Sequence, residues 1–183
     1  MWVVDGEMNI EYIESLTIKF INHNNITDEL INKIILIKGQ HWKYSIEDQL
    51  KWISKNINSN DKHLMIFNND NMLIAYMNMV NRTIEIENIV YDILGIGNIC
   101  VDSNYIGKSM GKLLMSVCTF NLNNINKTGV LLCKDKLISF YTKSGWKQYN
   151  NKLVINKEIF NNNVFFSDNR FINASEIIID RAF

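Results

Sequence analysis

One segment of the chain, an apolar run followed by a glycine-containing loop and an amphipathic stretch, restricts the possible folds more than any other. Residues 93–101 (ILGIGNICV) are almost entirely apolar, which is typical of a strand buried on both faces. From Met110 to Cys118 the apolar residues then recur with helical spacing. A buried strand that leads through a short loop into an amphipathic helix is typical of domains that combine helices with a central sheet.

The segments before this unit predict one strand and two capped helices. Alternating apolar residues indicate a strand over 12–20. Thr27 is placed to cap a helix that ends near Gly39, and Ser45 is placed to cap a second helix, because hydroxyl side chains accept hydrogen bonds from the free amides of a first turn. The apolar face of the second helix is expected to contain Ile46, Leu50, Ile53 and Ile57.

The rest of the chain alternates between short strands and helical segments. A turn is expected at 68–71, a short helix over 137–143 ends before Gly145, and the stretches around Asn150 and 161–163 are expected to be loops. The order predicts one mixed α/β domain over residues 1–183, with a central sheet of six to seven strands and about four helices. The strands are expected over 63–67, 72–80, 82–89 (as a strand or ribbon extension), 93–101, 130–133, 146–149 and 176–179.

Charge and cysteine usage argue against several classes of partner. The 19 basic and 19 acidic residues give a formal net charge of zero, which argues against a nucleic-acid partner and against a polybasic membrane-surface protein. Cys100, Cys118 and Cys133 form no CxxC pair and the histidines lack metal-ligand spacing, so no metal site is expected. No run approaches the roughly 18 apolar residues of a membrane span, and Met1–Glu7 does not resemble a signal peptide. We therefore expect a cytoplasmic protein.

The loop between the apolar strand and the amphipathic helix has the chemistry of an anion site. Gly107 and Gly111 allow a ligand to approach the backbone, and the free amides and dipole at a helix start favour negative charge, so a phosphate or pyrophosphate is the expected ligand. A P-loop is excluded because its first glycine would fall on Asp102. A dinucleotide fingerprint starting at Gly95 is excluded because its third glycine would fall on Cys100.

Two motifs in this part of the chain resemble those of the GNAT superfamily of N-acetyltransferases. Residues Ile106–Gly111 are similar to the acyl-CoA-binding pattern Q/R-x-x-G-x-G/A, with Ile106 where arginine or glutamine is usual and Ser109 where the first glycine is usual. Residues Phe140–Trp146 (FYTKSGW) are similar to the later family motif FYxKxGF. The resemblance covers roughly residues 10–150. The Gly-Trp ending and the late strand also resemble aminoglycoside 2'-N-acetyltransferases.

The resemblance implies a function and a set of site residues. It implies a V-shaped splay between the two central strands and transfer of an acetyl group from acetyl-CoA to a primary amine of a small molecule or peptide, by direct attack in a ternary complex. Tyr141 would protonate the departing thiolate, unless it only packs the short helix on the sheet. The alternative is an acyl-CoA-binding or sensing domain without turnover. The residues expected to bind the cofactor are Ile99, Cys100, Val101, Ile106, Gly107, Lys108, Ser109, Met110, Gly111 and Lys112.

Several roles stay open at the level of sequence. The glutamate that relatives often carry as a general base would fall on Gly97, which leaves Glu85, Glu87 or Asp92 acting through water. Cys100 is expected to be a small buried hydrophobe rather than a nucleophile. A homodimer is possible for a small enzyme of this type. His41 and Trp42 either line the acceptor pocket or pack as an ordinary pair.

Overall fold

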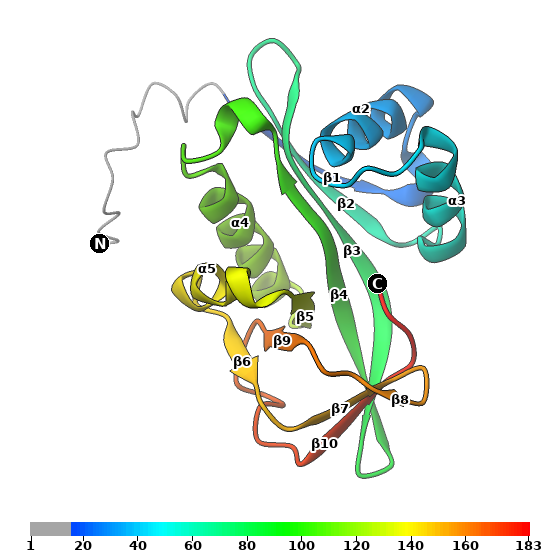
Figure 1. Ribbon diagram of the computed structural model, residues 1–183, viewed down its shortest axis with the longest axis vertical. Helices are drawn as coiled ribbons and strands as arrows, with labels where there is room; N and C mark the ends of the chain where they lie inside the picture. Colours follow the sequence, from blue (N-terminus) through cyan, green and yellow to red (C-terminus); the bar gives the residue numbers. More distant parts are fainter. Residues whose placement is uncertain (1–15) are drawn as a thin grey trace.

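The protein is built around one strongly twisted mixed sheet, with helices on both faces (Figure 1). The computed structural model describes residues 16–183, which include ten strands and four α-helices. The strand order is β6-β9-β5-β4-β3-β10-β7-β8, while β2 and then β1 extend the sheet beside the first half of β3. The bounds are β1 Thr17–Asn22, β2 Lys62–Phe67, β3 Leu73–Ile86, β4 Ile89–Val101, β5 Thr128–Cys133, β6 Lys147–Tyr149, β7 Lys152–Ile155, β8 Glu158–Ile159, β9 Asn163–Phe166 and β10 Glu176–Ile179.

The predicted mixed α/β architecture is confirmed, but the strand count was too low. Between the two stretches expected to be loops, around Asn150 and over 161–163, lie the unpredicted strands β7 and β8, and β9 begins at Asn163. These strands have two to four residues each, so the apolar alternation is too short to be recognised among the asparagines. The predicted strand over 12–20 begins outside the described residues, and its visible part is the edge strand β1. Because β1 pairs only with β2, Ile18 and Phe20 remain about 40% exposed.

The helices start where the capping residues predict. The Thr27 side chain accepts a hydrogen bond from the Leu30 amide at 3.3 Å, and the Ser45 side chain accepts one from the Asp48 amide at 3.0 Å. Figure 1 shows α2 and α3 on one side of β3 and β4, with α4 and α5 on the other. The bounds are α2 Asp28–Gly39, α3 Ile46–Asn56, α4 Met110–Asn124 and α5 Ile138–Lys143.

The predicted apolar face of α3 is only half correct. Ile53 and Ile57 are buried, whereas Ile46 and Leu50 are 62% and 45% exposed. The buried face runs at a spacing of four residues through Gln49, Ile53 and Ile57, which a purely apolar pattern cannot reveal because its first member is polar. The buried face of this helix therefore carries the side-chain amide of Gln49.

The two longest strands form one hairpin that runs the length of the molecule. β3 and β4 pair from Ile86–Ile89 to Ala75–Val101 through a two-residue turn. The turn residues Glu87 and Asn88 have φ of 52° and 65°, as expected for the turns that match the twist of an antiparallel pair. The segment 82–89 is thus an extension of β3 into this hairpin, and the hairpin tip lies at the bottom of Figure 1.

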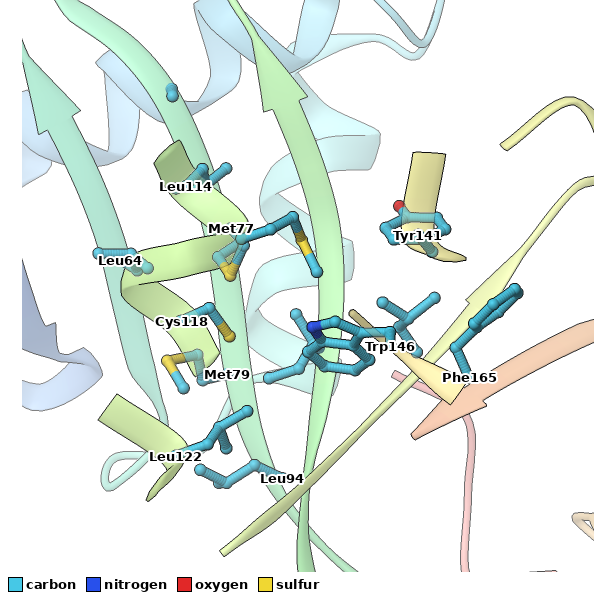
Figure 2. Packing of buried hydrophobic residues seen from close by; sticks show 14 of the residues in the cluster. Leu64, Met77, Met79, Leu94, Leu114, Cys118, Leu122, Tyr141, Trp146 and Phe165 are labelled. Carbon is cyan, nitrogen blue, oxygen red and sulfur yellow. The ribbon is translucent and has the colours of Figure 1, made fainter. Parts of the chain in front are cut away.

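The main core lies between the sheet and α4 with α5. Figure 2 shows Trp146 at its centre, between Leu122 of α4 and Phe165 of β9. Trp146 is 2% exposed, and its indole nitrogen donates a hydrogen bond to the Thr119 hydroxyl at 3.1 Å. A single large side chain therefore connects the later motif to α4.

His63 is fully buried on β2 and interacts through both ring nitrogens. Its Nε2 lies 3.0 Å from His23 Nδ1, and its Nδ1 lies 2.9 Å from the Tyr76 hydroxyl. A neutral imidazole satisfies both partners, because one nitrogen donates while the other accepts. Burial, reinforced by His23, lowers the pKa of His63 to about 4.

Lowering the pH from 7 to 5 is expected to reduce the free energy of unfolding by about 2 kcal/mol through His63. The unfolded imidazole takes up a proton below a pKa of about 6.5, whereas the folded one stays neutral until the pH approaches 4. The stabilisation is therefore complete above pH 6.5 and lost toward pH 4. Urea unfolding at both pH values measures it, and His63→Gln should remove most of the dependence. An NMR titration that gives His63 an ordinary pKa would contradict the prediction.

Candidate active site

The two central strands separate halfway along their length. β4 and β5 pair in parallel from Ile93–Thr128 to Ile96–Leu131, and no pairing between them follows although both strands continue. The part of β4 from Gly97 to Val101 therefore has a free edge toward β5. This confirms the predicted V-shaped splay, and it leaves backbone amides and carbonyls available to an extended ligand.

A bulge in β4 lies at the mouth of this splay. Tyr76 pairs with Cys100 and Asn78 with Gly97, so β4 has one more residue than β3 between the two pairs. Asn98, at the bulge, has a φ of 51°, and its side-chain amide donates to the Asn78 side-chain oxygen at 2.6 Å. The Asn78 side-chain nitrogen is buried and has no hydrogen-bond partner among the described residues. The bulge thus turns the backbone at the point where the strands part and leaves an unused buried donor beside it.

The start of α4 differs from the starts of the other long helices. Ser109 stands at the N-cap position with a φ of 60° and makes no side-chain capping bond, and the first turn contains no acidic residue. By contrast, α2 and α3 both have a capping hydroxyl and two acidic residues in the first turn. Gly107 has a φ of +81°, which favours glycine there. The uncapped amides and the nearby Lys108 and Lys112 suit a phosphate group, as the sequence predicts.

Gly111 brings the two predicted motifs into contact. A Cβ atom at this position would lie 3.3 Å from the Phe140 ring, so a larger residue would require this ring to shift, and the first turn of α4 lies directly against α5. The residue that follows Phe140 is the predicted acid, Tyr141. The helix that follows the predicted phosphate-binding loop and the helix that carries the predicted proton donor therefore contact each other.

Tyr141 lies at the inner side of α5, in the core that faces the splay (Figure 2). It is 4% exposed, and its hydroxyl has no hydrogen-bond partner within residues 16–183. Burial raises the pKa of the Tyr141 phenol, and the neighbouring Cys133 at the end of β5 raises it further. The phenol is therefore protonated at neutral pH and can act only as a proton donor in its resting form.

The buried cysteines are unsuited to nucleophilic catalysis. Burial raises the pKa of Cys100 to about 12 and that of Cys133 to about 11. A thiolate is the reactive form, so both side chains are inert thiols near neutral pH. The burial of Cys100 agrees with the expectation that its side chain is a small hydrophobe rather than a nucleophile.

The carboxylates considered as a general base lie at the wrong end of the hairpin. Glu85 and Glu87 are next to the tip, and Asp92 is five positions before Gly97, which corresponds to about 17 Å along the strand. Asp92 also accepts a hydrogen bond from the Lys127 ammonium at 2.9 Å. None of the three is therefore assigned as the base.

The two residues that follow α2, Gln40 and His41, form hydrogen bonds with the end of β4 and the two residues after it. The His41 ring nitrogen Nε2 donates to the Val101 carbonyl at 2.7 Å. The Gln40 amide donates to Asp102 at 2.8 Å and accepts from the Ser103 amide at 2.8 Å. His41 thus acts on the backbone of the predicted cofactor strand, a contact between distant segments that the sequence alone does not reveal.

A pocket of about 640 Å³ opens beside the β4 bulge on the α2 and α3 side of the sheet. Trp42 is among its lining residues and His41 is not, and the rings of the two side chains lie against each other with centres 5.7 Å apart. The Phe183 ring lies against Gly95, where a Cβ atom would be only 2.4 Å from the ring, so close packing accounts for this glycine. The other lining residues are Lys38, Tyr44, Asp48, Gln49, Trp52, Asn98 and Phe183.

Residues 16–183 carry no cluster of metal ligands and no helix that could span a membrane. That part of the chain contains no group of three or more histidine, cysteine or acidic residues that could hold a metal ion. None of its helices is long and apolar enough to cross a membrane.

Comparison with solved structures identifies the fold. The chain is similar to a GNAT family N-acetyltransferase from Escherichia coli in complex with CoA, with a TM-score of 0.64 and 12% identity over 91% of this chain and 90% of the other. It is also similar to an acyl-CoA N-acyltransferase from Pseudomonas aeruginosa, with a TM-score of 0.60 and 16% identity over 83% of this chain and 99% of the other. The protein therefore has the GNAT fold, which confirms the predicted resemblance at the level of structure.

Comparison of sequences gives a more distant relative. No protein-family model matches the chain. A protein of Amsacta moorei entomopoxvirus, provisionally named a glycylpeptide N-tetradecanoyltransferase, is 20% identical over 166 residues, which are 91% of this chain. The match covers 45% of that protein, so this chain spans about half the length of its relative.

Proposed function

We propose that this protein is an N-acyltransferase that moves an acetyl group from acetyl-CoA to the primary amine of a small molecule or peptide. Both substrates would be bound together, and the amine would attack the thioester directly. The observation that carries the proposal is the splay between β4 and β5 next to an uncapped helix start. The similarity to a CoA complex with the same fold supports the same co-substrate.

The backbone would make most contacts with the co-substrate. Ile99, Cys100 and Val101 on the free edge of β4 would bind the pantetheine arm, while the amides near the bulge would hold the thioester carbonyl as it gains negative charge. Residues 106–112 would surround the pyrophosphate, with Lys108 and Lys112 adding charge. Binding through amides fits the departures at Ile106 and Ser109, because amides are supplied by any residue.

The chemical step needs a proton donor for sulfur. As the nitrogen of the neutral amine bonds to the carbonyl carbon and releases one proton to solvent, the C–S bond breaks and sulfur leaves as a thiolate. Tyr141 would give this thiolate its proton, and the tyrosine would regain a proton from solvent. Such an acid contributes about 10²–10⁴ in rate.

Calorimetric titration with CoA and a thiol-release assay with acetyl-CoA and a panel of primary amines test this function. We expect Lys108→Ala combined with Lys112→Ala to weaken CoA binding about fivefold at low salt and less at high salt. Lys147→Ala, which removes an exposed lysine from β6, is the matched control and should leave the affinity unchanged. Absence of CoA binding would exclude the proposal, and binding without thiol release from any amine would favour the sensing domain.

The length of the acyl group needs its own comparison. The provisional name of the viral relative refers to a tetradecanoyl group, which is much longer than acetyl. Running the same assay with tetradecanoyl-CoA shows whether the protein prefers an acetyl or a tetradecanoyl group. We expect faster thiol release from acetyl-CoA, and the opposite order would assign the protein to long-chain transfer.

A further inference from the structure

The pocket beside the β4 bulge has the composition of a site for an acidic aromatic ligand. Four of its lining residues are aromatic, namely Trp42, Tyr44, Trp52 and Phe183. Asn98 connects the pocket to the point where β4 leaves β5. An acceptor bound here would therefore lie next to the expected position of the thioester.

Lys38 is a buried cation that forms no ion pair with any described residue. It is 5% exposed, and its ammonium lies 4.7 Å from the centre of the Trp52 ring. Between residues 16 and 183 this ammonium has no ion pair and no hydrogen bond. Burial lowers the pKa of Lys38 to about 8, so most of the side chain is still charged at pH 7. A buried charge is costly unless a partner compensates it, and the wall of an open pocket leaves that place to a ligand.

Gln49 is a second unpaired group in the same wall. Its side-chain oxygen is buried and accepts no hydrogen bond from any described residue, while its nitrogen donates weakly to the Tyr44 carbonyl at 3.4 Å. The Asp48 carboxylate also lines the pocket, but it is exposed and accepts a hydrogen bond from the Ser45 hydroxyl at 2.7 Å. The inner wall thus offers one cation and one free acceptor between aromatic surfaces.

We propose that this pocket binds an acceptor in which the amine is attached to an apolar or aromatic body that also carries a carboxylate. Lys38 would hold the carboxylate, Gln49 would accept a hydrogen bond from an N–H group, and Trp42 and Trp52 would contact the body. The role of this molecule as acceptor rests on the proposed function. The chemistry of the pocket itself does not depend on turnover.

Binding of L-phenylalanine and L-phenylalaninamide tests the inference, since the two probes have nearly the same size and differ in the carboxylate. Calorimetric titration of the full chain, with and without saturating CoA, should show L-phenylalanine binding at least about tenfold more tightly. Lys38→Met should abolish this preference, and Lys38→Arg should retain part of it because the charge remains. Lys55→Met, at an exposed position of α3, is the matched control and should bind both probes as the unaltered chain does.

The outcomes separate this inference from the proposed function. Equal affinity for the two probes, no binding of either, or a preference that persists in Lys38→Met would overturn the carboxylate site even if CoA binds and thiol is released. A carboxylate preference that depends on Lys38 in a protein that does not bind CoA would support the site and exclude the transferase.

Discussion

Replacing Tyr141 by phenylalanine is expected to lower kcat for acetyl transfer by about 10²–10³-fold while changing the affinity for CoA by no more than about twofold. The phenol is buried in the core, and burial raises its pKa, so it is protonated at neutral pH and can donate its proton as negative charge develops on the departing sulfur. The phenyl ring preserves the packing against Phe140 and Phe165, whose ring centres lie 5.0 and 5.8 Å from that of Tyr141. The loss should therefore appear in the chemical step and not in binding.

Tyr149→Phe is the matched control for this experiment. Tyr149 is also 4% exposed, but it lies on β6 and its hydroxyl donates to the carbonyls of Lys152 and Ala174. Removal of the Tyr149 hydroxyl should lower the free energy of unfolding by about 1–3 kcal/mol and leave kcat unchanged. If Tyr141→Phe retains full turnover, Tyr141 is a packing residue and the thiolate takes its proton elsewhere. Thiol-release rates and CoA titrations on both variants measure the difference.

Those parts of the fold that depend on local patterns could be predicted from the sequence. The helix starts at Thr27 and Ser45 are determined by side chains within three residues, and α4 has a clear helical period. The strands between 150 and 166 could not be predicted, because each is short and becomes a strand only by pairing with a distant one. β9, for example, lies between β5 and β6, which precede it in the chain.

The residues of the candidate site also fall into those that the sequence could predict and those that it could not. Gly107, Gly111 and Tyr141 belong to motifs that are contiguous in the chain, so their place at a helix start or on a short helix follows from the sequence. Lys38 and Gln49 could not be predicted as a pair. Each is a polar residue in an amphipathic helix, where solvent exposure is the usual expectation. Only the packing of α2 and α3 over the β4 bulge buries both of them in one wall.

Replacing Trp146 by alanine is expected to lower the free energy of unfolding by about 3–5 kcal/mol, the largest loss of stability we anticipate from a single substitution. The indole is 2% exposed and fills the space over Gly129 on β5, where a Cβ atom would lie 2.9 Å from the ring. Its nitrogen also bonds to Thr119 on α4. The substitution therefore leaves a cavity and an unpaired Thr119 hydroxyl between α4 and β5, one of the two strands that form the splay.

Trp146→Phe separates the two contributions to this loss. Phenylalanine keeps an aromatic ring over Gly129 but cannot donate to Thr119, so it should cost about 1–3 kcal/mol, clearly less than alanine. Trp52→Ala is the matched control, since Trp52 is partly exposed at the wall of the pocket beside the β4 bulge and should affect stability less than either. Urea unfolding of the three variants gives the order of their free energies of unfolding. If Trp146→Ala proved no more destabilising than Trp52→Ala, the core would be centred elsewhere, and the contact between α4 and β5 would not depend on the indole.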